Sequence, residues 1–454
     1  MKKSLELKLK DMRPEEIIAK VRNAGIVGAG GAGFPTHVKL SASADTVIIN
    51  GAECEPLLRV DQQFLQYYSE RVVIGLIAVM QATGAANGVI AIKHKHKTAI
   101  ESMSYAIAGR PIRLHLLDDF YPAGDEHLTV FETTGRLVPQ GGIPIKVGCV
   151  VVNVETLINV ANALEGNPVT HSFLTIGGAV KNPTTLRLPI GTSVADALSL
   201  AGEPVLAGMT VIEGGPMMGK IVQNLSQPIT KTTKGLLVFP DEHPLIQRRI
   251  MPIDKILKQA KTSCIQCRYC TDLCPRFLLG HKLEPHKIMR AVGHIQNQEE
   301  ALKMALTCSE CGICEQYACI MNLSPRIVNA AIKKELLKNG IRAEVPSEQH
   351  SSVLQGYRKV PVKRLINRLG IEKYNQDAAW NVGEVKVHCV KISLRQHAGV
   401  PSRPIVQVGQ RVECNELIAV IPDNCLGANV HASISGIVDE VGDNIVITAS
   451  NGGD

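Results

Sequence analysis

The chain has 454 residues, more than the roughly 100 to 200 of an ordinary domain, so it is expected to hold about three or four domains. Hydrophobic residues make up 45% of the sequence and charged residues 20%, which excludes a disordered chain. The net charge of +7 is small for this length and only 4% of residues are aromatic, so no nucleic-acid partner is expected.

Residues 72–92 carry no charge and could suggest a membrane span. Polar residues such as Gln81 and Thr83 interrupt the stretch, and Asn87-Gly88 is a turn signal, which favours a helix, a turn and a strand. The N-terminal residues lack the apolar core of a secretory signal. The sequence therefore predicts a cytoplasmic protein without a membrane span.

Residues 1–168 alternate between helical and strand-like runs. Helices are predicted over 14–25, 64–83 and 155–164, and strands over 46–50, 88–93, 112–117 and 149–153. Strands that alternate with helices indicate a layered α/β domain.

Three further domains and a linker are predicted after this region. Residues 169–242 show the β-branched alternation and turns of a small β-rich domain, and residues 250–345 are helical around a group of cysteines. The predicted linker, 346–383, contains a basic segment at 358–370 that could be a solvated helix face or a docking segment. Residues 384–454 resemble the barrel-sandwich fold of biotinyl and lipoyl carriers but lack the lysine that these carriers modify, so a structural or docking role is expected.

Eight of the 13 cysteines lie between Cys264 and Cys319, which in a reducing compartment indicates metal or redox chemistry rather than disulfides. The first set has the C-x-x-C-x-x-C-x-x-x-C-P spacing of bacterial ferredoxins, in which the fourth cysteine binds the neighbouring cluster. Two zinc sites are the alternative, although zinc ligands usually come as two separated pairs. We therefore expect two 4Fe–4S clusters.

The second set, CSECGICEQYACIM at residues 308–321, keeps the triplet spacing, but its fourth cysteine comes one residue late and no proline follows it. Because the fourth cysteine serves the neighbouring cluster, its offset can vary while the triplet spacing stays constant. Crossed ligation assigns the first cluster to Cys264, Cys267, Cys270 and Cys319, and the second cluster to Cys274, Cys308, Cys311 and Cys314.

A glycine loop, GAGGAGFPTHVKL at residues 28–40, superficially matches a dinucleotide fingerprint. That fingerprint must follow a strand, whereas here a helix precedes the loop and the strand comes after it. The loop is either a flexible turn or a set of bare backbone amides that can approach a phosphate or a flat ring.

Four blocks occur in the order seen in the flavoprotein subunit of respiratory complex I, which binds FMN and NADH: the glycine loop, NGAECEP, YPAGDEHL and VNVETLINV. Together with GGPMMG, TKTTKGLLV and the cysteine sets, they resemble the C subunit of the Rnf electron-transport complex. The motifs HPLIQRR, TDLCPRFLLGH, VPVKRLI and LRQHAG, with a barrel-sandwich domain at the C-terminal end, make the whole chain resemble the cobalamin reductases of the propanediol-utilisation microcompartment. Rnf subunits carry that domain at the N-terminus.

The resemblance implies a multidomain α/β protein with a complex-I-type FMN-binding domain, a β-grasp domain of the SLBB type, a helical two-cluster ferredoxin domain and a barrel-sandwich domain. It implies FMN contacts from Gly28, Gly30, Gly31, Gly33, Asn50, Glu53, Gly124, Asp125, Glu126 and Asn153, and NADH contacts from Phe34, Lys39 and Glu55. Ala29, Ala52 and Val152 depart from the complex I pattern. Without the resemblance, Phe34 could be a core residue, and Glu53 and Glu55 could cap the helix that follows them.

The implied function is a cobalamin reductase that passes electrons from NADH through FMN and two clusters to cobalamin. A corrinoid adenosyltransferase is the implied partner, with microcompartment shell proteins as further candidates, and the implied location is the microcompartment interior. The β-grasp domain is the candidate corrin surface. An Rnf-type subunit and a flavin-free electron carrier are the alternative functions.

Overall fold

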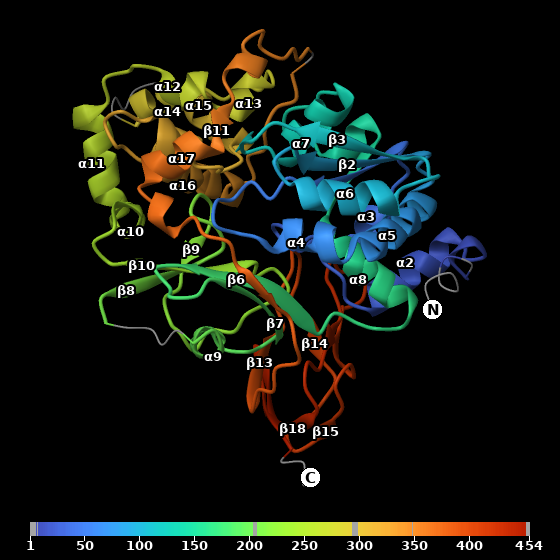
Figure 1. Cartoon of the computed structure of the whole chain (residues 1–454). Helices are drawn as coiled ribbons and strands as arrows, with labels where there is room; N and C mark the ends of the chain where they lie inside the picture. Colours follow the sequence, from blue (N-terminus) through green and yellow to red (C-terminus); the bar gives the residue numbers. More distant parts are fainter. Residues whose placement is uncertain (1–5, 7, 203–206, 293–297, 347, 451–454) are drawn as a thin grey trace.

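A four-stranded parallel sheet forms the centre of the N-terminal region (Figure 1). The computed structural model describes residues 6, 8–202, 207–292, 298–346 and 348–450. The strand order is β3 (Ile112–Leu117), β2 (Asn87–Lys93), β1 (Thr46–Gly51) and β5 (Cys149–Asn153). Strands β1, β2 and β5 are almost continuously buried, as expected where helices cover both faces of a parallel sheet.

The helices predicted from the sequence are present in this region, together with further helices over Thr36–Leu40, Lys97–Ala106 and Glu126–Thr134 that were not predicted. The helix expected over 64–83 is divided in two, because the chain leaves helical geometry at Tyr68. In the part of the chain that the structure describes, no helix combines the length and the apolar run needed to cross a bilayer. The helices of this region are α2 (Pro14–Asn23), α3 (Thr36–Leu40), α4 (Val60–Tyr67), α5 (Ser69–Thr83), α6 (Lys97–Ala106), α7 (Glu126–Thr134) and α8 (Val154–Leu164).

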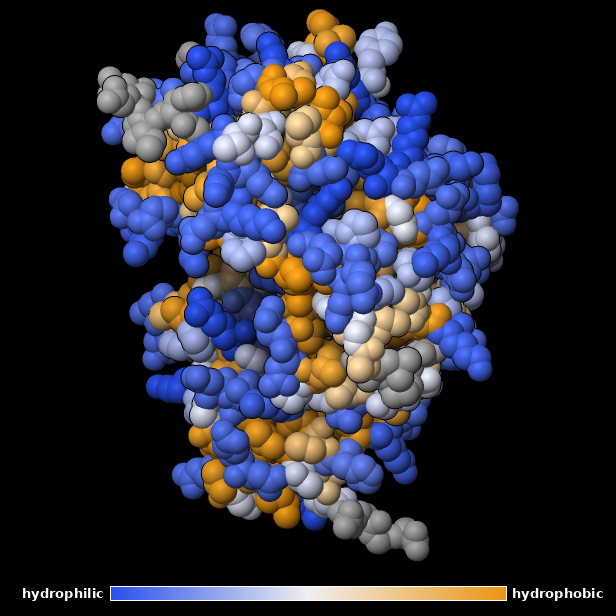
Figure 2. Space-filling view, turned by 90° about the vertical axis from the view of Figure 1, so that its left-hand side faces the viewer, coloured by the Kyte–Doolittle hydropathy of each residue, from blue (hydrophilic) through white to orange (hydrophobic). Residues whose placement is uncertain are grey.

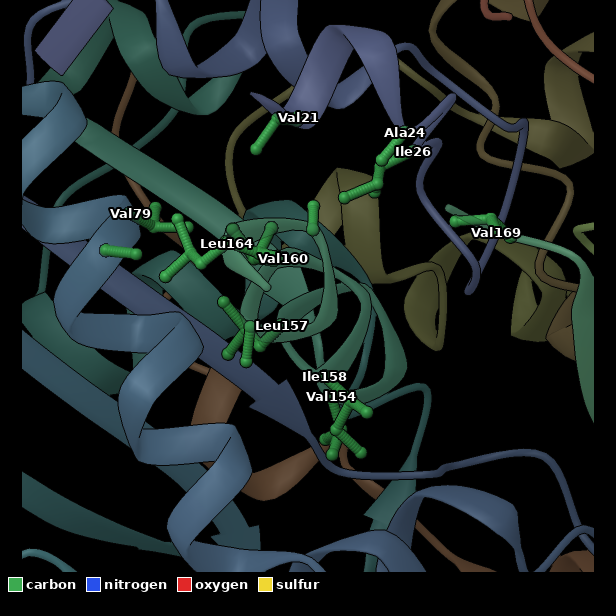
Figure 3. Close-up of a cluster of buried hydrophobic side chains, with 14 of the residues drawn as sticks. Val21, Ala24, Ile26, Val79, Val154, Leu157, Ile158, Val160, Leu164 and Val169 are labelled. Carbon is green, nitrogen blue, oxygen red and sulfur yellow. The ribbon is translucent and has the colours of Figure 1, made fainter. Parts of the chain in front are cut away.

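The core of this region depends on the close approach of α5 and α8 (Figure 3). Val79, Leu157 and Val160 are fully buried between these helices and the sheet. A Cβ atom on Gly75 would lie only 2.1 Å from the Leu157 carbonyl oxygen, so this crossing accepts only glycine without a backbone shift.

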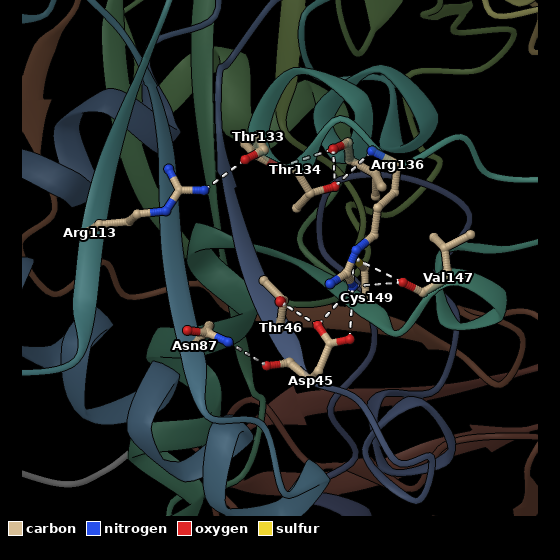
Figure 4. A network of polar contacts seen from close by, with 10 residues as sticks. Asp45, Thr46, Asn87, Arg113, Thr133, Thr134, Arg136, Val147 and Cys149 are labelled. Carbon is tan, nitrogen blue, oxygen red and sulfur yellow. Dashed lines mark hydrogen bonds and ion pairs between the residues drawn. The ribbon is translucent and has the colours of Figure 1, made fainter. Parts of the chain in front are cut away.

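A polar network closes the amino ends of the strands (Figure 4). One Arg136 nitrogen lies 2.8 Å from Asp45 Oδ1 and donates to the Val147 carbonyl oxygen, also at 2.8 Å. The carboxyl ends of the strands, at the opposite edge, remain available for a ligand.

The next region is a six-stranded mixed sheet with one helix on it, α9 (Val194–Leu200). One of its two edge strands, Ala379–Asn381, comes from the predicted linker. Trp380 on that strand stacks on Phe173 with ring centroids 6.0 Å apart. A second linker strand, β11 (Val360–Pro361), pairs with β4 (Phe120–Tyr121) of the N-terminal region. The order of the sheet is β12 (Ala379–Asn381), β7 (Thr184–Pro189), β6 (His171–Gly178), β10 (Gly235–Pro240), β8 (Met209–Glu213) and β9 (Lys220–Ile221).

Short helices surround the cysteines in the upper left of Figure 1. They are α10 (Pro244–Arg249), α11 (Ile253–Ser263), α12 (Tyr269–Asp272), α13 (Pro275–Leu278), α14 (Pro285–Ala291), α15 (Glu299–Lys303), a π-helix (Ile313–Ala318) and α16 (Pro325–Lys338). Helix α17 (Val362–Leu369), in the basic segment, buries Leu365 and Ile366 and exposes Lys363, Arg364 and Arg368, so its positive charges lie on a solvated face.

The C-terminal residues form two small sheets at the bottom of Figure 1, as expected of a barrel sandwich. Ala398 N–H donates to the Gly33 carbonyl oxygen at 3.0 Å, which joins this region to the glycine loop. Figure 2 shows apolar side chains in separate patches within a largely hydrophilic surface. The strands are β13 (Cys389–Ser393), β14 (Arg403–Pro404), β15 (Arg411–Val412), β16 (Leu417–Val420), β17 (Val430–His431), β18 (Gly436–Val441) and β19 (Asn444–Ala449).

The close crossing of α5 and α8 predicts that Gly75→Ala destabilises the N-terminal region although alanine favours helices. Forcing the two helices apart is expected to cost about 1–3 kcal/mol and to lower the melting temperature by several degrees. The matched control is Gly356→Ala, because a Cβ atom on Gly356 meets nothing within 4 Å. Equal melting temperatures for the two variants in a calorimetric scan would contradict this account of the crossing.

Candidate functional site

Two asparagines mark the carboxyl edge of the parallel sheet. Asn50 on β1 lies directly opposite Asn153 on β5 in the strand register. The strand order reverses between β1 and β5, and ligands of open α/β sheets bind in the crevice at such a switch point. The sheet topology thus brings together two predicted flavin contacts that are far apart in the sequence.

The glycine loop lies over this crevice. A Cβ atom on Gly30 would stand 3.0 Å from Asn153 Nδ2, and Ala29 N–H donates to Thr156 Oγ1 at 3.1 Å. Gly31 is exposed with open space around it. Gly33 is different, because residues 396–398 of the barrel region cover it, so Gly33 anchors the loop rather than lining open space.

The YPAGDE segment closes the other side of the crevice. Asn50 Nδ2 donates to the Gly124 carbonyl oxygen at 2.7 Å, while Lys39 Nζ lies 3.2 Å from Glu126 Oε1. Asp125 caps the N-terminus of α7, as Asn153 caps that of α8. Two helix N-termini therefore begin at the same edge of the sheet. The N-terminus of α7 is already capped by a carboxylate, whereas that of α8 is capped by a neutral amide, and its partial positive charge suits an anionic ligand such as a flavin phosphate.

Glu53 has a structural role that the alternative interpretation anticipated. Its carboxylate accepts hydrogen bonds from the Asp61 and Gln62 N–H groups at the start of α4. Burial, together with the nearby Asp61 carboxylate, raises the pKa of Glu53 to about 7. Glu53, Cys54 and Glu55 also line a cavity of about 250 Å³.

The three predicted NADH contacts lie in different surroundings. Lys39 contacts Glu126, one of the predicted flavin residues, and Phe34 is 38% exposed, which excludes the interpretation as a core residue. Glu55 instead accepts hydrogen bonds from the N–H groups of Met217 and Met218, each at 2.9 Å. Glu55 therefore holds the 214–218 loop of the β-grasp region against the crevice.

An ion-pair network beneath Asn153 was not anticipated from the sequence. Asn153 Nδ2 donates to Asp61 Oδ2 at 2.7 Å, and Lys234 pairs with both Asp61 and Glu155. Lys234 lies in TKTTKGLLV, so this motif was the available signal, but its spacing alone does not reveal the partner carboxylates.

The eight clustered cysteines surround two separate cavities, in the crossed arrangement that the sequence predicts. One cavity is lined by Cys264, Cys267, Cys270 and Cys319, and the other by Cys274, Cys308, Cys311 and Cys314. The two triplets share a backbone geometry, because the left-handed residues Gln266 and Arg268 of the first correspond to Glu310 and Gly312 of the second. Among the described residues, no three or more His, Cys, Asp or Glu side chains lie close enough together to hold a single metal ion.

A π-helix accommodates the extra residue before Cys319. Residues 313–318 are π-helical, whereas the corresponding turn before Cys274 is α-helical. The wider π turn takes up one more residue, and both fourth cysteines then leave their helices in the same extended conformation, with φ near −70° and ψ between 110° and 119°. The irregular spacing is therefore no sign of a damaged site.

The cysteine surroundings suit iron–sulfur clusters. Burial, and then the neighbouring cysteine thiolates, raise the pKa of Cys314 well above its ordinary value, and in the same way raise that of Cys270 to about 12. Four thiolates are therefore stable together only beside a positively charged metal group. Glu310 N–H and Leu323 N–H point at the sulfurs of Cys308 and Cys319, at 3.4 and 3.2 Å, as expected of groups that tune a cluster.

The YPAGDE segment also contacts the second cysteine cavity. Tyr121 Oη donates to the Cys311 carbonyl oxygen at 2.6 Å. Arg276, two residues after Cys274, forms an ion pair with Asp125 at 2.9 Å, and both side chains are nearly buried. One segment therefore borders both the sheet crevice and the second cysteine set.

Crossed ligation predicts how paired cysteine substitutions combine. Cys319→Ser should remove the cluster held by the Cys264 triplet, lowering the iron content from about eight to about four per chain. Adding Cys264→Ser should remove no further iron, whereas adding Cys308→Ser should remove nearly all of it. Iron and sulfide analysis of anaerobically purified protein measures the loss of each cluster. Cys425→Ser is the control, because Cys425 is exposed and lines neither cavity. The opposite pattern would contradict crossed ligation.

Four family models match the chain in the order of the observed regions. They are the Nuo51 FMN-binding domain at residues 21–162, the SLBB domain at 173–220, the 4Fe-4S dicluster domain at 263–324 and the RnfC barrel sandwich hybrid domain at 379–452. These matches confirm the predicted fold class and favour iron–sulfur clusters over zinc.

Curated relatives cover almost the whole chain. Cobalamin reductase PduS of Salmonella typhimurium is 46% identical over 95% of this chain and 96% of that protein, and the Citrobacter freundii protein of the same name is 47% identical over 94% and 95%. The C subunit of the proton-translocating ferredoxin:NAD(+) oxidoreductase complex of Clostridium ljungdahlii is 36% identical, but over only 59% of this chain and 58% of its own length. The chain belongs to the PduS family of cobalamin reductases.

Proposed function

We propose that this oxidoreductase reduces cobalamin with electrons from NADH, through FMN and two 4Fe–4S clusters. The observation that carries the proposal is the similarity to cobalamin reductases over almost the whole chain, with FMN-binding and 4Fe-4S models matching in the same order. When bound, FMN accepts two electrons as hydride and can release them singly to the clusters.

The crevice residues are proposed to bind and orient the flavin. The exposed Gly30 and Gly31 and the N-terminus of α8 would hold its phosphate and ring, while Asn50 and Asn153 supply polar side chains from the ends of the neighbouring strands β1 and β5. Phe34 and Lys39 would border the nicotinamide. Glu55 contributes by holding the 214–218 loop in place.

The electron path is proposed to run from the crevice to the second cluster and then to the first. Contacts from Tyr121 to the Cys311 carbonyl oxygen and from Asp125 to Arg276, two residues after Cys274, support a second cluster nearer the proposed flavin segment. Cys274, Cys308 and Cys314 are buried, whereas Cys267 is exposed, so the first cluster is the one open to an acceptor.

A corrinoid adenosyltransferase is the proposed partner, because it would consume the reduced cobalamin. A propanediol-utilisation microcompartment is the proposed location, and its shell proteins are further candidate partners. The Rnf-type alternative is less supported, because its relatives match about three-fifths of the chain rather than nearly all of it.

The proposal predicts flavin and cluster absorption bands in anaerobically purified protein. NADH should bleach both, and adding aquacobalamin should restore them while the corrin spectrum changes. A spectrum without flavin would support the electron-carrier alternative. An unchanged corrin spectrum after reduction by NADH would contradict cobalamin reduction.

The Asp125–Arg276 contact predicts a specific defect in electron transfer. Arg276→Met should slow reduction of the clusters at least about tenfold, because a small displacement of the donor segment costs much rate, while NADH–ferricyanide activity at the flavin persists. Stopped-flow measurement of cluster bleaching tests this. Arg13→Met removes the exposed Arg13–Glu16 pair and is the matched control. Equal bleaching rates in both variants would show that the buried pair does not position the path.

A further inference from the structure

We propose that the corrin ring docks on the surface around the first cluster, formed by Ile265, Tyr269, Ile320 and Met321, with Arg248 and Arg368 holding the phosphodiester of its nucleotide tail. This acceptor surface, as we call these six residues, rests on the proposed function and adds the place where the substrate binds. It differs from the β-grasp surface expected from the sequence.

The acceptor surface exposes four large apolar side chains next to ligand cysteines. Ile265, Tyr269, Ile320 and Met321 are 58%, 47%, 51% and 42% exposed. Each is a sequence neighbour of a first-set cysteine or lies two residues from one, and Ile265 and Met321 line the first cysteine cavity itself. Large apolar side chains exposed around the first cysteine set suit a ligand with apolar faces.

The exposure of the cysteines points to the same surface. Cys267 is exposed and the other three cysteines of the first set are partly exposed, while three of the four in the second set are buried. A ligand bound at the acceptor surface would therefore lie close enough to the first cluster to accept an electron from it.

Two guanidinium groups at its edge have no carboxylate partner among the described residues. Arg248 and Arg368 both donate to Asn322 Oδ1, at 2.9 and 3.3 Å, and Arg368 also donates to the Cys319 carbonyl oxygen. Neither forms an ion pair with any described carboxylate, and the nearby Glu315 is buried and paired with Arg326. Two unneutralised guanidiniums suit a phosphate group, which they can bind with paired hydrogen bonds.

Cobalamin carries both kinds of group that the acceptor surface is suited to bind, an apolar ring and a phosphate. Its corrin ring presents wide apolar faces, and its nucleotide tail carries one phosphodiester anion. The cavity beside Glu53 holds only about 250 Å³, less than the roughly 300 to 1,000 Å³ of pockets that enclose drug-sized ligands, so it cannot enclose the larger corrin. An open surface beside the exposed cluster has no such limit.

Binding is measured with the intact holoenzyme and cyanocobalamin by equilibrium dialysis, independently of turnover. Tyr269→Ser and Ile320→Ser should each weaken binding about three- to tenfold, because each removes apolar contact area. Tyr105, which is 81% exposed on the N-terminal region, provides the matched Tyr105→Ser control. Iron analysis of each variant confirms that its clusters are retained.

Cobinamide, a corrinoid without the nucleotide phosphodiester, isolates the role of the arginines. Arg368→Gln should weaken cyanocobalamin binding about tenfold and leave cobinamide binding nearly unchanged. Equal losses for both corrinoids would overturn the phosphodiester assignment. Unchanged binding in all acceptor-surface variants would overturn the docking inference, and weaker binding in Met218→Ser instead would favour the β-grasp region, where Met218 is 48% exposed.

Cobalamin reduction by the same proteins separates the two proposals. A wild-type enzyme that reduces cobalamin while every acceptor-surface variant binds it normally contradicts the docking inference alone. A wild-type enzyme that NADH reduces but that neither binds nor reduces cobalamin contradicts the proposed function.

Discussion

The buried ion pair between Asp125 and Arg276 is the contact on which the functional arrangement depends. One Asp125 oxygen caps α7 at the edge of the parallel sheet, and the other accepts from Arg276, which follows Cys274 and Pro275. Breaking a buried pair by removing one partner typically costs about 3–5 kcal/mol, since the remaining charge is left unpaired. The pair therefore holds the YPAGDE segment and the second cysteine set in a single geometry.

The β-grasp and barrel-sandwich regions both contact segments that border the same crevice. Glu55 binds the 214–218 loop of the β-grasp region, and Lys231 of that region donates to carbonyl oxygens of Gly25 and Asn429. Burial lowers the pKa of Lys231 to about 7. A barrel sandwich without a modifiable lysine thus has a clear structural use, because it covers Gly33 and secures the glycine loop.

The predicted linker also has a structural role. Its β11 strand pairs with β4, which contains Tyr121, and its β12 strand extends the β-grasp sheet. Residues between the cysteine region and the barrel therefore join the N-terminal region to the β-grasp region, whereas their composition suggested a connection with a basic helix that is either solvated or a docking segment.

Local pattern was enough to predict much of this protein. Strand and helix periodicity gave the elements of the parallel sheet, and the triplet cysteine spacing gave two crossed sets that surround two cavities, because both features are encoded within short stretches of chain. The resemblance of the motif order added the domain types. The division of one predicted helix into α4 and α5, however, depended on backbone geometry at Tyr68 that periodicity does not report.

The sequence by itself determined the domain types, the cysteine sets and the motifs that could meet a flavin. Only the tertiary structure decided that Asn50 faces Asn153, that Arg276 reaches Asp125, and that Glu55 holds a neighbouring loop. These contacts join residues about a hundred or more positions apart, and no periodicity or spacing encodes such a partner. The tertiary structure also shows that a π-helix takes up the extra residue before Cys319, whose sulfur then lines the first cavity.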